Sequence, residues 1–257
     1  MKNKANFKKM KKTTKYSLLT AAAISVTTIA GLIYHGKRNG KGPFQSLKDY
    51  PKDIENITKN YPLTRNGEIV FYGASNFTYW QQMENDIPAY KVQNHGFGGS
   101  TDKLLIKHAQ ELLFDYDPNI VFIQTGSNDY VNLSGSDEKK VQKCIEIKKA
   151  MYEYFHDNLP DTKFVIMSGL LLPKRSEFVN LTNMINSQLK QICEEYDYLY
   201  FVDASEMTYQ NGIFKEELFK EDGIHLNHDG QLKWCNDYII PMIDHLVEKY
   251  HLYDLKK

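Results

Sequence analysis

Residues of the types that carry out nucleophilic catalysis occur in two short segments of the sequence. Ser75 follows four apolar residues and a glycine in the stretch IVFYGASN, and Asp222 stands three residues before His225. A serine hydroxyl is a weak nucleophile at neutral pH and needs a base. An aspartate at this spacing can hydrogen-bond an imidazole, fix its tautomer and stabilise the imidazolium. A helix-capping serine and a loop pair without chemistry are the alternatives. Together the segments make Ser75 a candidate nucleophile, His225 its base and Asp222 the orienting acid.

Acyl transfer also needs hydrogen-bond donors aimed at the oxyanion that develops in the transition state. Gly98-Gly99 allows a backbone N–H to approach a ligand without an intervening Cβ. Asn128, in the block GSND, can offer its side-chain amide, and the Ser75 N–H is a third donor. A flexible turn at the two glycines and an Asx turn at Asn128 are the competing interpretations of each feature alone. Their occurrence together with the serine and the histidine favours an acyl-transfer site.

The elements that would bring these residues together follow from the hydrophobic pattern. Apolar or β-branched runs, typical of strands buried on both faces, occur at residues 68–72, 90–93, 119–124, 163–168 and 198–202. Helices are predicted at about 52–61, 137–158, 177–196 and 229–250, the last interrupted at Pro241. This alternation predicts a parallel sheet with helices on both faces and a ligand site at the carboxyl ends of the strands. Ser75, the two glycines and Asn128 follow the first three runs.

The first 41 residues differ in charge from the rest of the chain. They hold ten of the 32 Lys and Arg residues and no acid. Residues 42–257 therefore hold 22 bases against 32 acids, a net charge of −10. An acidic body argues against nucleic acid as a partner, because phosphate binding needs a basic face.

A candidate membrane anchor follows the basic tail. Seven lysines in residues 1–15 precede residues 16–35, YSLLTAAAISVTTIAGLIYH, which bear no formal charge and have the length of a helix that crosses a bilayer. The lysines would remain in the cytoplasm. We predict a cytoplasmic tail at 1–15, a single-pass anchor at 16–35, a linker and short helix at 36–61, and an extracytoplasmic domain at 62–257. A cleaved signal peptide, giving a secreted protein, is the alternative.

The cysteines are assigned to the core. Cys144, Cys193 and Cys235 lie in predicted helices, and the chain has no CxxC motif and no Cys/His cluster. We therefore expect neither a disulfide framework nor a metal site.

Other conspicuous side chains are also given structural roles. Trp80, with Phe77 and Tyr79, is predicted to pack in the core rather than to bind substrate. Lys148-Lys149 is predicted to lie on a solvated helix face. The apolar residues 170–172, after the fourth strand, either line an acyl pocket or cover the sheet.

These blocks of polar residues resemble those of the SGNH hydrolases, also called the GDSL esterase/lipase family, over roughly residues 67–250. In that family the serine of a Gly-Asp-Ser-Leu-like block is the nucleophile, and Ser75 matches it in GASN. The oxyanion hole is completed by a glycine, matched by Gly99 in GST, and by the asparagine of a Gly-x-Asn-Asp block, matched by Asn128. The family's Asp-x-x-His block supplies acid and base, and Asp222 and His225 match it.

The resemblance implies a flavodoxin-like three-layer α/β/α domain with a five-stranded parallel sheet. It also implies a serine esterase that uses neither a metal nor an organic cofactor. The serine block departs from the family pattern at two positions, because Ala74 stands where the family carries an aspartate and Asn76 where it carries a leucine. The first difference bears on how the serine loop is held.

The substrate is inferred from the predicted location as well as the family. A cell-surface esterase suggests short acyl or O-acetyl groups on polysaccharide, while the family equally admits lysophospholipids and other acyl esters. Transfer of acetyl to a glycan hydroxyl would use the same acyl-enzyme. A catalytically inactive member would bind glycan or lipid, and the complete set of site residues argues against it.

Overall fold

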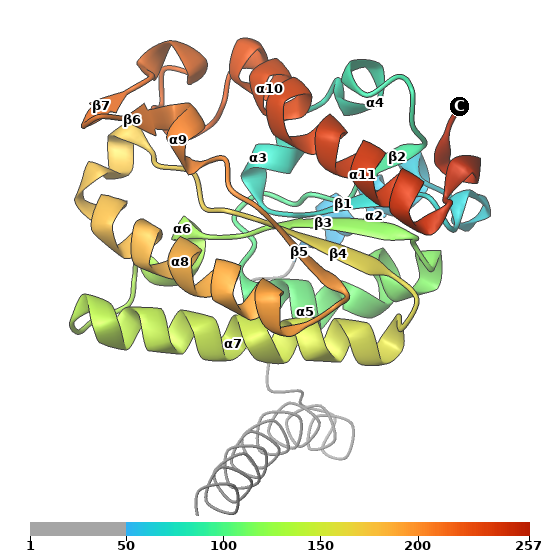
Figure 1. The fold of residues 1–257 in the computed structure, drawn as a ribbon, viewed down its shortest axis with the longest axis horizontal. Coiled ribbons are helices and arrows are strands. Elements are labelled where there is room, and N and C mark those ends of the chain that lie inside the picture. Colours follow the sequence, from blue (N-terminus) through green and yellow to red (C-terminus); the bar gives the residue numbers. More distant parts are fainter. Residues whose placement is uncertain (1–49) are drawn as a thin grey trace, which may run out of the picture.

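The computed structural model describes residues 50–257 (Figure 1). The predicted tail and membrane anchor at residues 1–35 lie outside the described residues, as does the predicted linker up to residue 49. Within the described part of the chain, no helix is both long and apolar enough to cross a bilayer. The described chain begins at Tyr50, followed by helix α2 (Pro51–Asn60), which buries Ile54 and Ile57 against the core.

Five parallel strands form one sheet, as predicted, and their order is β2-β1-β3-β4-β5. The strands are β1 (Ile69–Gly73), β2 (Val92–Asn94), β3 (Ile120–Gln124), β4 (Lys163–Met167) and β5 (Leu199–Val202). Ile69 of β1 lies opposite Val92 of β2 on one side and Ile120 of β3 on the other. The chain runs from β1 outward to β2 and then crosses back to β3. The strand order therefore reverses between β1 and β3, where doubly wound sheets bind their ligands.

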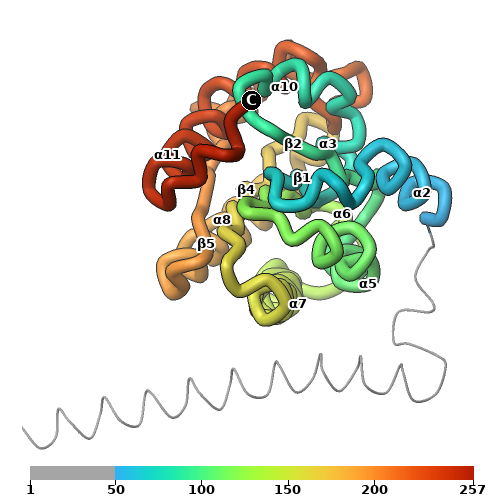
Figure 2. The backbone as a smooth tube through the Cα atoms, turned by 90° about the vertical axis from the view of Figure 1, so that its right-hand side faces the viewer, coloured from blue at the N-terminus to red at the C-terminus, as the bar shows by residue number. Residues whose placement is uncertain are grey.

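Helices cover both faces of the sheet, as the end-on view shows (Figure 2). Successive side chains of a strand point to opposite faces, and both sets are buried in β1. Val70 and Tyr72 join one core cluster, whereas Ile69 and Phe71 join the other. The first cluster contains residues of α2, α5 (Asp102–Leu112), α7 (Asp137–Asn158) and α8 (Val179–Glu195). The second contains residues of α3 (Ser75–Thr78), α4 (Met83–Asp86), α10 (His228–Trp234) and α11 (Ile240–Tyr250).

The C-terminal helix is interrupted close to the predicted position. One π-helical stretch, Cys235–Ile239, joins α10 to α11, and Pro241 lies in the first turn of α11. Proline suits a first helical turn because its missing N–H has no partner there in any case. The helix therefore changes its hydrogen-bonding pattern just before the proline.

Several short elements were not anticipated. A two-stranded antiparallel hairpin, β6 (Tyr209–Gln210) and β7 (Ile213–Phe214), follows the one-turn helix α9 (Ser205–Thr208). Helices α3, α4 and α6 (Ser127–Tyr130) each contain four residues. Such lengths are too short to show helical periodicity in the sequence.

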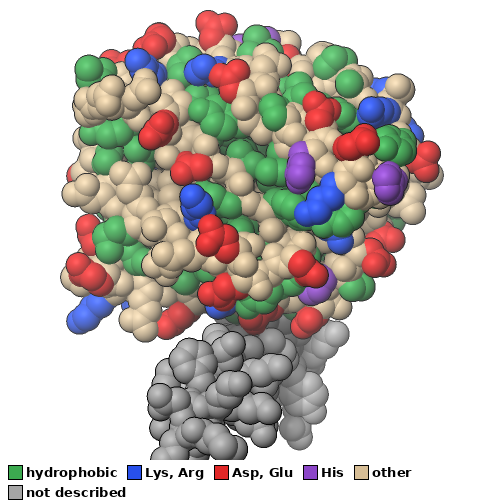
Figure 3. Space-filling model, viewed as in Figure 1, with side chains coloured by type: hydrophobic (Ala, Val, Ile, Leu, Met, Phe, Trp, Pro, Cys, Tyr) green, Lys and Arg blue, Asp and Glu red, His purple; other side chains and the backbone are tan. Residues whose placement is uncertain are grey.

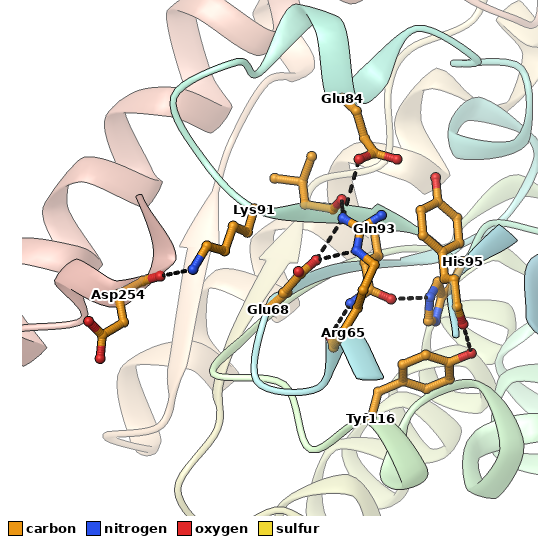
Figure 4. Close-up of polar contacts among 10 residues, drawn as sticks. Arg65, Glu68, Glu84, Lys91, Gln93, His95, Tyr116 and Asp254 are labelled. Carbon is orange, nitrogen blue, oxygen red and sulfur yellow. Dashed lines mark hydrogen bonds and ion pairs between the residues drawn. The ribbon is translucent and has the colours of Figure 1, made fainter. Parts of the chain in front are cut away.

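Polar contacts secure the β2 edge of the sheet (Figure 4). The Arg65 guanidinium donates to Glu68 at 2.7 and 2.9 Å, to Glu84 at 3.2 Å and to the Val92 carbonyl at 2.9 Å. Lys91 donates to the Asp254 carbonyl at 2.7 Å, which holds the C-terminal segment beside the same strand. Because an unpaired strand edge is prone to association with other chains, these contacts protect the shortest strand of the sheet.

The three cysteines are free and buried, as predicted. Burial raises the pKa of the Cys144 thiol to about 11 and those of Cys193 and Cys235 to about 12. Thiols with such pKa values are poor nucleophiles at neutral pH.

On the face of the molecule seen in Figure 3, acidic and basic side chains are interspersed rather than gathered by sign.

Candidate active site

A cavity of about 450 Å³ lies at the carboxyl ends of the strands. Its lining comes from the loops that follow β1, β2, β3 and β4, from the loop before α10, and from Asp53 of α2. Ser75, Gly99, Asn128 and His225 all belong to this lining. The site therefore occupies the point where the strand order reverses.

The serine, the histidine and the aspartate form a continuous hydrogen-bonded chain. His225 Nε2 lies 2.8 Å from Ser75 Oγ, although 150 residues separate them in sequence. His225 Nδ1 lies 2.7 Å from Asp222 Oδ2. With the Nδ1 proton directed at the carboxylate, Nε2 is left as an acceptor for the serine hydroxyl.

The loop of Asp222 and His225 is built around the aspartate carboxylate. Asp222 Oδ1 accepts hydrogen bonds from the backbone N–H groups of Ile224 at 2.8 Å and His225 at 2.9 Å. Partial burial raises the pKa of Asp222, but the hydrogen bonds from the His225 ring and these two N–H groups outweigh it, and the pKa falls to about 2. The carboxylate is therefore ionised at neutral pH and available to orient the imidazole.

Three residues of the cavity lining, Ser75, Gly99 and Asn128, carry potential oxyanion donors. Within residues 50–257, the backbone N–H groups of Ser75 and Gly99 have no hydrogen-bond acceptor. The Asn128 amide uses one hydrogen on the Ser100 carbonyl at 3.1 Å, which leaves its second hydrogen unused. Gly98 also lines the cavity, and a Cβ built on it would lie 3.9 Å from the Ser75 Cβ.

Two glycines are required for this geometry. Gly73 ends β1 so close to β3 that a Cβ would lie 2.3 Å from the Gln124 carbonyl oxygen. Gly99 has a φ of +80°, which side-chain-bearing residues rarely adopt. The backbone of the serine loop is held by a bond from the Ala74 N–H to the Gln124 carbonyl at 3.1 Å, and the Ala74 side chain is buried in the cavity wall. The serine loop is thus held by backbone contacts at the position where the resemblance would place an acid.

Of the three aromatic residues after the serine, two are in the core and one is at the site. Phe77 and Trp80 are fully buried, as predicted. Tyr79 is 46% exposed, and its ring lies 4.5 Å from that of His225, so the prediction of core packing was wrong for this residue. The Lys220 ammonium stands 4.4 Å from the centre of the same Tyr79 ring. Tyr79 therefore limits the movement of the imidazole.

The prediction of a solvated face was wrong for Lys148, which is only 2% exposed. Its ammonium donates to Asp102 Oδ1 at 2.9 Å and to Thr125 Oγ1 at 2.5 Å. Thr125 also donates to Asp102 at 2.6 Å, and the Asp102 N–H donates to Asp129 Oδ1 at 2.9 Å. Asp102 begins α5 just after the Gly99 loop, and Thr125 and Asp129 flank Asn128. The network therefore ties together the two loops that carry potential oxyanion donors.

The charges in this network depend on a proton at Asp129. Burial, and next the nearby Asp102 carboxylate, raise the pKa of Asp129 to about 7. The Oδ2 atoms of Asp102 and Asp129 are shielded from solvent, and neither has a hydrogen-bond partner among the described residues. A proton on Asp129 removes one of the two neighbouring negative charges and supplies a donor that the Asp102 carboxylate can accept. Burial alone would lower the pKa of Lys148, but Asp102 raises it and keeps the ammonium charged.

Arg175 is a further cavity residue that the sequence did not single out. It lies in the 3₁₀ segment Pro173–Phe178 after β4, beside Leu170 and Leu172 in the lining. These two leucines face the cavity, which is one of the two roles considered for residues 170–172. No local motif marks Arg175, since it follows a proline and a lysine in an ordinary loop.

Within residues 50–257, no three His, Cys, Asp or Glu side chains come together as ligands for a metal ion.

Comparison with known sequences gives one family match. The sequence model of the GDSL-like lipase/acylhydrolase family matches residues 57–233, which include Ser75, Gly99, Asn128, Asp222 and His225. No curated protein matches the chain.

Solved structures share the fold at low sequence identity. A Streptococcus pneumonia protein provisionally named a platelet activating factor is 18% identical, with a TM-score of 0.61 over 79% of this chain and 93% of its own. A GDSL-like lipase from Bacteroides thetaiotaomicron is 20% identical, with a TM-score of 0.53 over 78% of this chain and 96% of its own. A carbohydrate esterase of family 3 from Talaromyces cellulolyticus is 15% identical, with a TM-score of 0.53 over 70% of this chain and 98% of its own.

Proposed function

Because the chain belongs to the GDSL-like lipase/acylhydrolase family and is a serine ester hydrolase, we propose that Ser75 is its nucleophile, His225 its general base and Asp222 the acid that orients the histidine. The observation that carries the assignment is the unbroken chain of hydrogen bonds from Ser75 Oγ through the imidazole to the Asp222 carboxylate. This geometry activates a hydroxyl that is otherwise a weak nucleophile.

Acylation begins when Ser75 Oγ attacks the ester carbonyl carbon and its proton passes to His225 Nε2. Asp222, ionised because its pKa lies near 2, stabilises the imidazolium through Nδ1–H. The tetrahedral intermediate then expels the alcohol, which takes the proton from Nε2. In deacylation, water attacks the acyl-serine and gives a proton to the same nitrogen. Collapse of the second intermediate releases the carboxylic acid and restores the Ser75 hydroxyl.

The oxyanion of each intermediate is assigned to the Ser75 N–H, the Gly99 N–H and the Asn128 amide. The two backbone N–H groups have no hydrogen-bond acceptor within residues 50–257, so they need not break a hydrogen bond within the protein in order to bind the oxyanion. Donors fixed in place before the reaction stabilise developing charge without reorganisation. The Lys148 network contributes by holding the Gly99 and Asn128 loops together.

The proposed substrate is a short acyl ester, with O-acetyl groups of a cell-surface or other polysaccharide as the foremost case. Support comes from the cavity, in which polar groups and glycines interleave with a few large apolar side chains, Leu170, Leu172 and Ile224. A long acyl tail needs a continuous apolar lining. The solved carbohydrate esterase with the same fold is consistent with a glycan substrate. The uncharged segment 16–35 after a lysine-rich tail supports a membrane-anchored, extracytoplasmic enzyme, with secretion as the alternative.

The assignment is tested on the full chain with para-nitrophenyl acetate, butyrate and octanoate and with a fluorophosphonate probe. Ser75→Ala should abolish both hydrolysis and labelling, with the unfolding transition unchanged. Full acetate hydrolysis by Ser75→Ala would refute the nucleophile. A clear preference for octanoate over acetate would refute the short-acyl proposal and favour a lipase, while leaving the catalytic assignment intact.

A further inference from the structure

Arg175 is the only Lys or Arg among the described residues that line the cavity. It is half-buried, and it shares the lining with Asn128 and His225. The mechanism described above assigns no role to its positive charge.

The positive charge of the Arg175 side chain is not balanced by an ion pair within residues 50–257. Arg175 Nη1 donates to Ser127 Oγ, and Ser127 is the residue immediately before Asn128. No carboxylate of residues 50–257 forms an ion pair with the guanidinium. Asp53 also lines the cavity without pairing with it. Guanidinium groups that are withdrawn from water are normally paired, because desolvation of an uncompensated charge is costly. A guanidinium carries five N–H donors in a planar fork, so most of its donors remain for a ligand.

The backbone holds Arg175 between two loops of the site. Its own N–H donates to the Leu172 carbonyl at 3.0 Å, and the backbone is kinked there, with φ −130° and ψ 37°. The preceding N–H, of Lys174, donates to the Gly223 carbonyl at 3.1 Å in the loop that ends at His225. The guanidinium is bonded on its other side to the Ser127 loop. These contacts fix the charge at the cavity wall instead of leaving it on a free surface chain.

We propose that Arg175 binds an anionic group of the substrate, a carboxylate or a phosphate, so that the enzyme prefers esters that carry a negative charge close to the scissile bond. The inference rests on the proposed ester hydrolysis at Ser75 and narrows its substrate class. Planar guanidinium groups bind carboxylate and phosphate through paired, charge-assisted hydrogen bonds. The net charge of −10 over residues 42–257 repels anions in general, so a local cation inside the cavity is the feature that would select them.

The test compares the full chain and its variants on matched pairs of esters. Monoacetylglycerol phosphate against monoacetylglycerol tests phosphate, and meta-acetoxybenzoate against phenyl acetate tests carboxylate on the alcohol side. Para-nitrophenyl hemisuccinate against the butyrate tests carboxylate on the acyl side. Arg175→Gln should lower kcat/KM for at least one anionic ester by roughly 10- to 100-fold more than for its neutral partner, as expected for a lost charge-assisted bond.

Two variants separate recognition of the anion from general damage to the site. Lys174→Gln removes the same charge from the adjacent, exposed residue outside the cavity lining, and should leave every anionic-to-neutral ratio unchanged. Arg175→Lys keeps the charge and should recover part of the preference.

If Arg175→Gln lowers activity on charged and neutral esters equally, Arg175 has a structural role and the proposal is wrong. If wild type shows no preference for the anionic ester in any pair, the proposal is also wrong. Hydrolysis of the neutral esters would in that case still support the proposed ester hydrolysis at Ser75. If wild type hydrolyses none of the esters, the proposed hydrolysis itself fails, and with it the basis of this inference.

Discussion

Lys148→Met is the substitution that most directly tests the network beneath the oxyanion loops. The ammonium is 2% exposed and is bonded to the fully buried Asp102 at 2.9 Å. Methionine has a similar length and no charge, so the variant leaves the Asp102 carboxylate buried without a cation. Removing one partner of a buried ion pair costs about 3–5 kcal/mol of unfolding free energy. For a domain of this size each kcal/mol corresponds to about 2–4 °C, so the midpoint should fall by about 6–20 °C.

Activity should fall together with stability, because Asp102 and Thr125 lie in or beside the loops of Gly99 and Asn128. Small displacements of oxyanion donors reduce kcat, and we expect a loss of about 10- to 100-fold at temperatures where the variant is folded. Calorimetry or urea unfolding measures the first effect, and the hydrolysis of para-nitrophenyl acetate measures the second.

The chain provides a matched control one residue away. Lys149 makes a 2.9 Å ion pair with Glu195, but both side chains are partly exposed, and such surface pairs contribute about 0–1 kcal/mol. Lys149→Met should therefore leave both midpoint and kcat close to wild type. The double variant Asp102→Asn/Lys148→Met should regain much of the lost stability, because it no longer buries an unpaired charge. A stability loss for Lys148→Met no larger than that for Lys149→Met would refute the reasoning.

Two further predictions concern Asn128, which lies beside this network, and Asp129, which belongs to it. Asn128→Ala should lower kcat by about 100- to 1,000-fold with little change in KM, as expected for a donor that acts in the transition state; a loss confined to KM would contradict this role. Asp129 has a folded pKa of about 7, above its ordinary value near 3.8, so its contribution to stability is present at low pH and is lost as pH rises toward and through 7. Asp129→Asn, which mimics the protonated carboxyl, should therefore lose less stability than wild type between pH 5 and pH 8 in urea unfolding. Parallel losses in the two proteins would show that Asp129 does not hold the proton.

The sequence alone predicted the parallel sheet and indicated the candidate catalytic residues, because both leave short patterns in the sequence. Continuous apolar runs of four to six residues are typical of strands buried on both faces, and β1 and β3 are buried throughout. Ser75 and the Asp222–His225 pair are candidates because their short blocks occur together in one chain, since each block alone also fits a helix cap or an ordinary loop. Ser75 follows β1 at the carboxyl edge of the sheet, and the loop before α10 brings His225 within hydrogen-bond distance of it.

Tertiary structure decided which side chains surround that chemistry. Lys148 and Lys149 are neighbours in sequence, yet about 100° of helix rotation separates them. Lys148 meets the buried acid Asp102, 46 residues away, whereas Lys149 pairs with the exposed Glu195. Arg175 faces the cavity because its loop is bonded to Gly223 and Ser127, which come from two other segments of the chain. A charged residue on a helix or in a loop has the same local sequence whether it is solvated or buried. Its environment depends on partners brought together by long-range folding, which a local pattern does not contain.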